Sequence, residues 1–177
     1  MNKRWWAGLR TIGGVFDERL SSLAEQAAAG LRARQHTIAV AEGSCGGLIS
    51  ASLLAVPGAS DYYAGGAVIY TLAAGRAFMA GAIPTPEGLR GATEEFARYL
   101  AQSAAAKLSA QWGIGEGGAA GPTGNRYGDP AGHAWVAVSG PYEHGATRHV
   151  LTGSDDRAGN MVEFAVAALG LLVEQLA

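Results

Sequence analysis

The stretch that most constrains this chain is residues 37–50, where an apolar run passes through a small-residue turn into a short amphipathic segment. Residues 37–41 are apolar and β-branched, which is typical of a buried strand. Residues 48–56 predict a helix that stops at Pro57. A strand that turns into a helix in this way presents free backbone N–H groups and the positive end of the helix dipole. We therefore expect an anionic ligand, such as a phosphate, to bind at the turn.

The turn between this strand and this helix combines glycines with two candidate nucleophiles. Gly43, Gly46 and Gly47 let a ligand approach the backbone closely, and Ser44 and Cys45 offer a hydroxyl and a thiol. A thiolate at a helix N-terminus is more reactive than a free one. The other interpretation of Cys45 is a small side chain that only packs in the core.

Bulk properties narrow the class of protein. The chain has 177 residues, 49% of them hydrophobic, which fits one domain with a sizeable core over residues 16–177, after an irregular lead-in over residues 1–15. Charged residues are only 16% and the net charge is -2, so no basic patch favours nucleic-acid binding. Trp5 and Trp6 suggest one interpretation of the function, namely an interaction protein that binds no small molecule.

Cysteine, histidine and hydropathy patterns bear on the cellular location of the protein and on whether it binds a metal ion. Cys45 is the sole cysteine, so no intramolecular disulfide can form and a reducing, cytoplasmic location is expected. Residues 11–15 are too short and glycine-rich for a membrane span, and no membrane association is expected. The four histidines show no ligand spacing, so we predict neither a metal site nor a cofactor.

Helices and strands alternate over the first two thirds of the chain. Helices are predicted from Asp17 to about Arg34, over 72–80, from Thr93 to about 112, and from Asp155 or Asp156 to the C-terminus. Further strands are predicted over 65–71, and over 133–139 and 146–152 as an antiparallel hairpin. The glycine-dense residues 114–124 superficially match a dinucleotide fingerprint, but they lead to Pro122 and a loop, so no element is assigned there. The order predicts a three-layer α/β/α sandwich with a mixed, mostly parallel sheet of about five strands.

Several motifs together resemble the CinA C-terminal domain family. They are residues 37–42 and 46–50, then 56–70 with the sequence Val-Pro-Gly-Ala-Ser-Asp-Tyr-Tyr-Ala-Gly-Gly-Ala-Val-Ile-Tyr, then 91–97, 120–122 and 132–136. The resemblance covers nearly the whole chain from about residue 20. It implies the same α/β/α sandwich and a dimer or larger homo-oligomer. It also implies a relationship to nicotinamide mononucleotide deamidases, which hydrolyse the carboxamide to the acid and ammonia.

The departures from the family pattern fall on reacting groups. Where active members read Glu-Ser-x-Thr-Gly-Gly with the Ser as nucleophile, this chain has Gly43 for the Ser and Cys45 for the Thr. Where they read Tyr-Ser-Asn-x-x-Lys, this chain keeps Tyr70 but has Leu72 and Gly75 for the Asn and Lys. A Ser–Lys mechanism needs a nucleophile and a base within hydrogen-bond reach. The family reaction by the family route is therefore not expected here.

Other motif positions supply ligand-binding candidates. The family's Thr/Ser-Gly-x-Ala-Gly-Pro motif corresponds to residues 117–122, with Gly121 as its glycine, and the family's Gly-Asp-Arg motif to Asp156 and Arg157. Arg148 is a second candidate for holding a phosphate, with a solvated salt bridge as the alternative for both arginines. Neither Ser44 nor Cys45 has an evident base, because Gly75 offers none and Arg76 is expected on the next face of its helix.

Glu42 and Tyr70 each allow two interpretations. Glu42, at the end of a buried strand, acts as a general base or binds a backbone N–H in the turn. Tyr70 lines the same site, since both strands end on one side, or is a core tyrosine with a satisfied hydroxyl. We predict a nucleotide-like ligand pocket, nicotinamide mononucleotide being one candidate ligand, whose deamidase chemistry is lost or altered. The alternative is an active deamidase that uses Ser44 or Cys45.

Overall fold

One mixed sheet of five strands organises the computed structural model, which describes residues 17–141 and 145–177. The strands are β1 (Ile38–Glu42), β2 (Tyr63–Val68), β3 (Trp112–Ala119), β4 (His133–Ser139) and β5 (Gly145–Leu151). Their order is β2-β1-β3-β4-β5, in which β1 pairs in parallel with β2 and β3. β4 is antiparallel to both β3 and β5, so it alone runs against the other four. Residues 1–15, with Trp5 and Trp6, and His144 lie outside the described residues.

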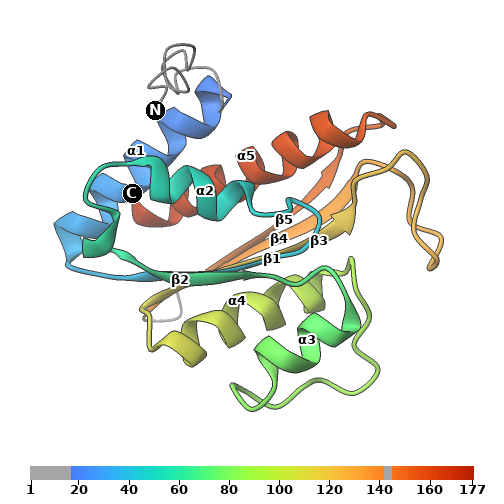
Figure 1. Cartoon of the computed structure of the whole chain (residues 1–177), viewed down its shortest axis with the longest axis horizontal. Coiled ribbons are helices and arrows are strands. Elements are labelled where there is room, and N and C mark those ends of the chain that lie inside the picture. Colours follow the sequence, from blue (N-terminus) through green and yellow to red (C-terminus); the bar gives the residue numbers. More distant parts are fainter. Residues whose placement is uncertain (1–16, 142–144) are drawn as a thin grey trace, which may run out of the picture.

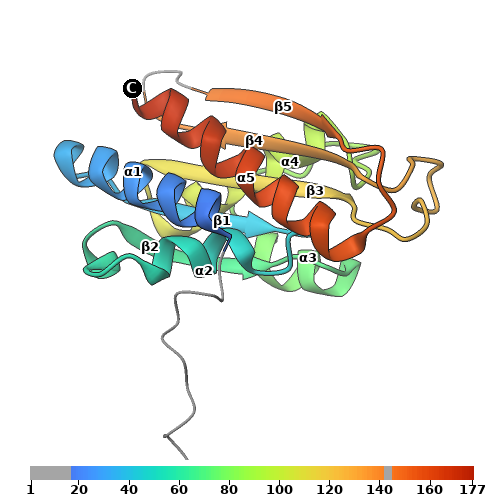
Figure 2. The same ribbon diagram turned by 90° about the horizontal axis from the view of Figure 1, so that it is seen from above.

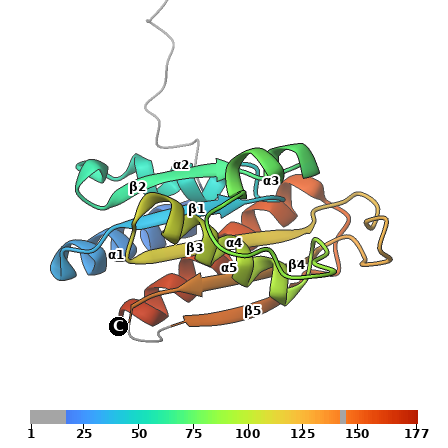
Figure 3. The ribbon, with the colours of Figure 1, turned by 90° about the horizontal axis from the view of Figure 1, so that it is seen from below.

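Helices cover both faces of the sheet. The helices are α1 (Glu18–Arg34), α2 (Leu48–Ala55), α3 (Leu72–Met79), α4 (Glu94–Leu108) and α5 (Arg157–Leu176), with a 3₁₀ turn η1 (Ala59–Asp61). Figure 1 shows α1, α2 and α5 on one face and α3 and α4 on the other. Seen from above, α5 crosses the sheet beside α1 (Figure 2), and seen from below, α3 and α4 lie in front of it (Figure 3). This confirms the three-layer α/β/α sandwich with a mixed sheet.

The larger core lies between the sheet and the layer of α1, α2 and α5. Leu20, Phe164 and Leu172 have 1% or less of their surface exposed there. By length and composition alone α5 could cross a membrane, but its apolar residues pack on α1, β4 and β5. That packing is the arrangement of a core helix, since burying such a face is what stabilises helices in globular proteins.

Side-chain caps fix where most helices begin. Asp17, Thr93 and Asp156 accept hydrogen bonds from the first turns of α1, α4 and α5, as predicted, with Asp156 and not Asp155 at the last position. Thr71 does the same for α3 by accepting from the backbone N–H of Ala74. The strand β2 therefore lies earlier than the predicted strand over 65–71, since it begins at Tyr63 and ends at Val68, and Thr71 belongs to the cap of α3.

The central strand β3 is the element that the sequence prediction omits. Residues 112–119 form a regular strand paired on both sides, although glycine is depleted in strands. A Cβ on Gly113 or Gly115 would lie 2.0 Å from the carbonyl oxygen of Ala101 or Ala97 on α4. Glycine at these positions therefore allows α4 to pack directly on the backbone of β3. The pattern of side chains in the sequence does not reveal such a close approach.

Candidate functional site: a cavity beside the β1–α2 turn

The carboxylate of Glu42 occupies the start of α2. One of its oxygens accepts from the backbone N–H of Gly47 at 3.0 Å and of Ile49 at 3.1 Å. The other accepts from the backbone N–H and the hydroxyl of Ser50, at 3.0 and 2.6 Å. Glu42 is fully buried. Of its two predicted roles, the structure shows the binding of backbone N–H groups.

This contact corrects the expected place of an anionic ligand. The free N–H groups and the dipole of α2 are satisfied by an anion that belongs to the chain itself. Gly46 and Gly47 have φ values of 65° and 106°, a conformation that favours glycine, and Gly47 is the N-cap of α2. Glu42, Gly46 and Gly47 thus shape the turn, and none of them lines the adjacent cavity.

A second buried carboxylate, Glu116, holds the first half of the turn. Its Oε2 accepts from the backbone N–H of Gly43 at 3.0 Å and of Cys45 at 2.9 Å, and its Oε1 accepts from the hydroxyl of Ser44. Burial raises the pKa of Glu116, opposed by these hydrogen bonds and reinforced by the charge of Glu42. Sequence reasoning missed Glu116; its one signal is a lone acid within a glycine-rich run.

Cys45 is a core side chain. It is fully buried and belongs to the cluster beneath α1, α2 and α5. Burial, and then the charges of Glu116 and Glu42, raise the pKa of its thiol well above the ordinary value. A protonated thiol without access to solvent is a poor nucleophile, so the structure favours the packing interpretation of Cys45.

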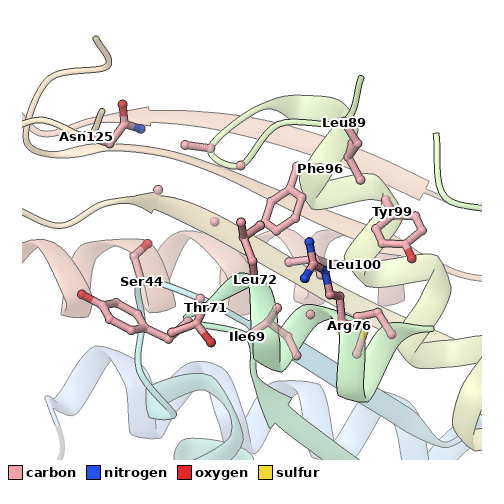
Figure 4. A pocket seen from close by; sticks show the side chains of 18 of the residues that line it. Ser44, Ile69, Thr71, Leu72, Arg76, Leu89, Phe96, Tyr99, Leu100 and Asn125 are labelled. Carbon is pink, nitrogen blue, oxygen red and sulfur yellow. The ribbon is translucent and has the colours of Figure 1, made fainter. Parts of the chain in front are cut away.

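A cavity of about 620 Å³ lies on the opposite side of the turn, at the carboxyl ends of β1 and β2. Figure 4 shows it between the turn that carries Ser44, the helix α3 and the face of α4 that carries Phe96 and Tyr99. Of the predicted site residues, Gly43, Ser44 and Tyr70 line it. Gly75 lines it too, so the two positions where the resemblance places a nucleophile and a base face one space.

Arg157 joins two further predicted residues beside this cavity. Its Nη1 donates to the carbonyl oxygen of Gly121 at 2.7 Å, and its Nη2 donates to the hydroxyl of Tyr70 at 3.3 Å. The ring of Tyr70 is exposed and lines the cavity, which excludes the core interpretation. Arg148 instead forms an exposed ion pair with Glu174 at 2.7 Å, the alternative predicted for it.

Two arginines line the cavity that the sequence did not place there. Arg76 follows Gly75 on α3 and was expected on another face of the helix, yet both line the cavity because it extends along α3 toward α4. Arg126 comes from the segment after β3 and donates to the hydroxyl of Tyr127 at 2.7 Å. The cavity therefore has a cationic lining that motif comparison alone does not predict.

Two histidines separated in sequence meet on β4 and β5. The Nε2 of His149 lies 2.9 Å from the Nδ1 of His133, whose Nε2 lies 2.8 Å from the carbonyl oxygen of Ala92. Burial and the neighbouring His133 lower the pKa of His149. Within residues 17–141 and 145–177, no three His, Cys, Asp or Glu side chains gather as metal ligands would.

The chain is an open α/β sheet domain with a cavity at the carboxyl ends of its parallel strands, the edge of such sheets at which ligands are bound in general. Residues 20–176 match the model of the CinA C-terminal domain. The chain belongs to that family.

Relatives and solved structures agree with this assignment. A CinA-like protein of Anaeromyxobacter sp. (strain Fw109-5) is 35% identical over 168 residues, covering 94% of this chain and 40% of the relative. One from Acidobacterium capsulatum is 38% identical, covering 72% of this chain and 31% of the relative. The chain thus spans about a third of the length of such relatives. A CinA superfamily protein from Enterobacter cloacae, 26% identical, superposes with a TM-score of 0.81 over 89% of this chain and 92% of that one.

Proposed function

We propose that this chain binds a nucleotide-like small molecule in the cavity and does not hydrolyse it by the Ser–Lys route of the active family members. The observation that carries the proposal is that Gly43 and Gly75 both line one cavity of about 620 Å³. They stand where the resemblance places the nucleophile and the base, while the surrounding cavity is large enough for a ligand. The proposal is thus a binding site without its reacting side chains.

The remaining candidate nucleophiles support this proposal unequally. The thiol of Cys45 is buried and its pKa is raised, so it is neither accessible to a ligand nor readily ionised to the nucleophilic thiolate. Ser44 lines the cavity, but its hydroxyl hydrogen is directed to Glu116. Glu116 in turn accepts from two backbone N–H groups, an arrangement that serves to pin the turn.

The alternative is an active deamidase in which Ser44 is the nucleophile. One observation favours it, because Glu116 is a base within hydrogen-bond reach of Ser44 whose pKa is raised by burial. Ser44 Oγ would bond to the carboxamide carbon while Glu116 takes the hydroxyl proton and returns it to the departing ammonia. Water would then hydrolyse the acyl-enzyme ester to the acid.

Ammonia release from nicotinamide mononucleotide separates the two candidates. The purified protein, Ser44→Ala and the matched control Cys45→Ala are assayed together, with thermal melting in the presence of the nucleotide. We expect no release and a raised melting temperature in all three proteins. Release that Ser44→Ala abolishes and Cys45→Ala retains would establish the alternative. If the protein shows no ammonia release and no thermal shift, the result would favour the interpretation as an interaction protein that binds no small molecule.

Restoring the missing groups tests the inherited site from the other direction. A side chain at Gly75 has room, since its Cβ would lie 3.7 Å from the nearest atom, a methyl of Ile69. A Cβ at Gly43 would lie 3.3 Å from the carbonyl oxygen of Glu116, a tight contact. We expect Gly43→Ser with Gly75→Lys to gain measurable deamidase activity, and Gly75→Lys alone to gain none. No gain from the double variant would count against an inherited nucleotide site.

Assembly and location belong to the same proposal. The resemblance implies a homo-oligomer, which light scattering after size-exclusion chromatography tests directly. A cytoplasmic location, expected from the single cysteine, stays a prediction that cell fractionation tests.

A further inference from the structure

Arg76 is a cation without a protein partner inside the cavity. Among residues 17–141 and 145–177, no hydrogen bond or ion pair is formed by its guanidinium group, in contrast to Arg126, which donates to Tyr127. Figure 4 shows the Arg76 side chain rising from α3 with its guanidinium group directed toward the side of the cavity where Phe96 and Leu100 lie. Its five N–H donors are thus free for a ligand.

The rest of the lining is apolar or uncharged. Among the residues that the structure describes, no Asp or Glu lines the cavity, and the charged residues that line it are Arg76 and Arg126. Close to Arg76 the wall consists of large apolar and aromatic side chains: Ile69, Leu72, Met79, Phe96, Tyr99 and Leu100. Arg76 itself is exposed, so its guanidinium group is reached from solvent, and an anion that binds it would place the rest of the ligand against this apolar wall.

We propose that Arg76 binds the anionic group of the cavity's ligand, a small organic anion whose carboxylate or phosphate is joined to an aromatic body. This deepens the proposed function, on which it rests, by assigning the ligand's charge and the residue that recognises it. Guanidinium pairs with either anion through two parallel N–H···O bonds. The aromatic body follows from the wall, since the aromatic residues Phe96 and Tyr99 line the cavity and aromatic side chains pack favourably with flat aromatic groups.

Two other arginines, Arg90 and Arg126, lie at the exposed rim of the cavity around Tyr127. The guanidinium groups of Arg90 and Arg126 both lie over the ring of Tyr127, with their central carbons 5.1 and 4.9 Å from its centre. Arg90 is neutralised by Asp129 at 2.6 Å, and Arg126 is held by the Tyr127 hydroxyl. Arg126 thus uses one of its five N–H donors on a neutral partner within the chain, whereas Arg76 uses none among the described residues, which is why the anion is assigned to Arg76.

The test compares three probes of one shape class, namely benzamide, benzoate and phenyl phosphate, titrated into the full chain by nuclear magnetic resonance at pH 7.5. Benzoate reports a carboxylate, phenyl phosphate reports a phosphate, and benzamide is the neutral control. We expect the favoured anion to bind about tenfold or more tightly than benzamide, the size of a charged hydrogen-bonded contact. In Arg76→Met this preference disappears, whereas Arg126→Met, the matched control from the same cavity, retains it.

Each outcome decides the matter. Loss of the anion preference in Arg76→Met and in the second neutral variant, Arg76→Gln, with melting temperatures unchanged, supports the assignment. No preference in the parent protein, a preference that survives both variants, or an equal loss in Arg126→Met overturns it. The outcome is separable from the proposed function, because nicotinamide mononucleotide can fail to bind while benzoate or phenyl phosphate binds through Arg76, or the reverse.

Discussion

Replacing Glu42 by Gln should destabilise the protein far more than replacing Glu116 by Gln, although both carboxylates are fully buried register partners on β1 and β3. The difference lies in the donors. Each of the two carboxylate oxygens of Glu42 accepts a hydrogen bond from at least one backbone N–H group. A glutamine NH₂ placed on either side would therefore face a donor that cannot turn away.

The magnitude follows from these contacts. With the NH₂ group toward Ser50, one backbone N–H loses its acceptor, which costs about 1–3 kcal/mol. The negative charge at the start of α2 is lost as well, worth roughly 0.3–1 kcal/mol. The Ser50 hydroxyl can rotate to accept and so adds no penalty. We expect Glu42→Gln to lower the free energy of unfolding by about 1–4 kcal/mol.

Glu116→Gln keeps every hydrogen bond. Its amide oxygen can accept from the backbone N–H groups of Gly43 and Cys45, and its NH₂ group can donate to Ser44, whose hydroxyl reverses its role. The removal of a buried charge offsets the weaker neutral bonds. We expect a change within about 1 kcal/mol of the parent.

The sign of the pH dependence distinguishes Glu116 further. Because its pKa is raised in the folded state, its favourable contribution is complete below the ordinary value of 4.5 and declines as the pH rises above it. Glu116→Gln should therefore gain stability relative to the parent as the pH rises from 4.5. Urea unfolding followed by circular dichroism measures all of these values. If Glu42→Gln costs under about 1 kcal/mol, or Glu116→Gln costs as much as Glu42→Gln, the described hydrogen bonding of the turn is wrong.

Three further outcomes are expected. Cys45 is fully buried with a raised pKa, so Ellman's reagent should modify it only after denaturation, and rapid modification of the native protein would contradict its placement. Gly115→Ala would bring a Cβ within 2.0 Å of the Ala97 carbonyl oxygen, so thermal melting should show a loss of about 3 kcal/mol or more, or no folded protein. The hydrogen bond from Arg90 lowers the pKa of Asp129 from 3.8 to about 2, so its contribution is complete above pH 3.8 and is lost as the pH falls toward 2; acid titrations of Asp129→Asn should lack that decline.

Sequence patterns predicted those parts of the fold whose cause is local. The strand–turn–helix over residues 37–50, the caps at Asp17 and Thr93, and the β4–β5 hairpin follow from periodicity, capping chemistry and turn residues close in the chain. The strand β3 could not be predicted in this way, because its glycines are required by the close packing of α4 on the backbone of β3. Tertiary packing overrides strand propensity at this point.

The candidate site divides in the same way. Motif positions identified Gly43, Ser44 and Tyr70 at the cavity, and Arg157 with Gly121 beside it. They could not show that Glu42 fills the start of α2, because this depends on a carboxylate folding back onto its own chain. Likewise, no local signal tells which part of a short exposed helix borders a cavity, so Arg76 emerges from the structure alone.

The contact between α4 and β3 decides which parts of the cavity are free to change. No side chain larger than hydrogen fits at Gly113 or Gly115, so two backbones set the distance between α4 and β3, and Phe96, Tyr99 and Leu100 of α4 line the cavity from that fixed position. Most residues of α3 are exposed, and the segment of residues 80–91 follows it along the opposite wall. New ligand preferences within this architecture can therefore arise by substitution of lining side chains, most freely in α3 and that segment, where a larger or smaller side chain alters the cavity without disturbing the contact between α4 and β3.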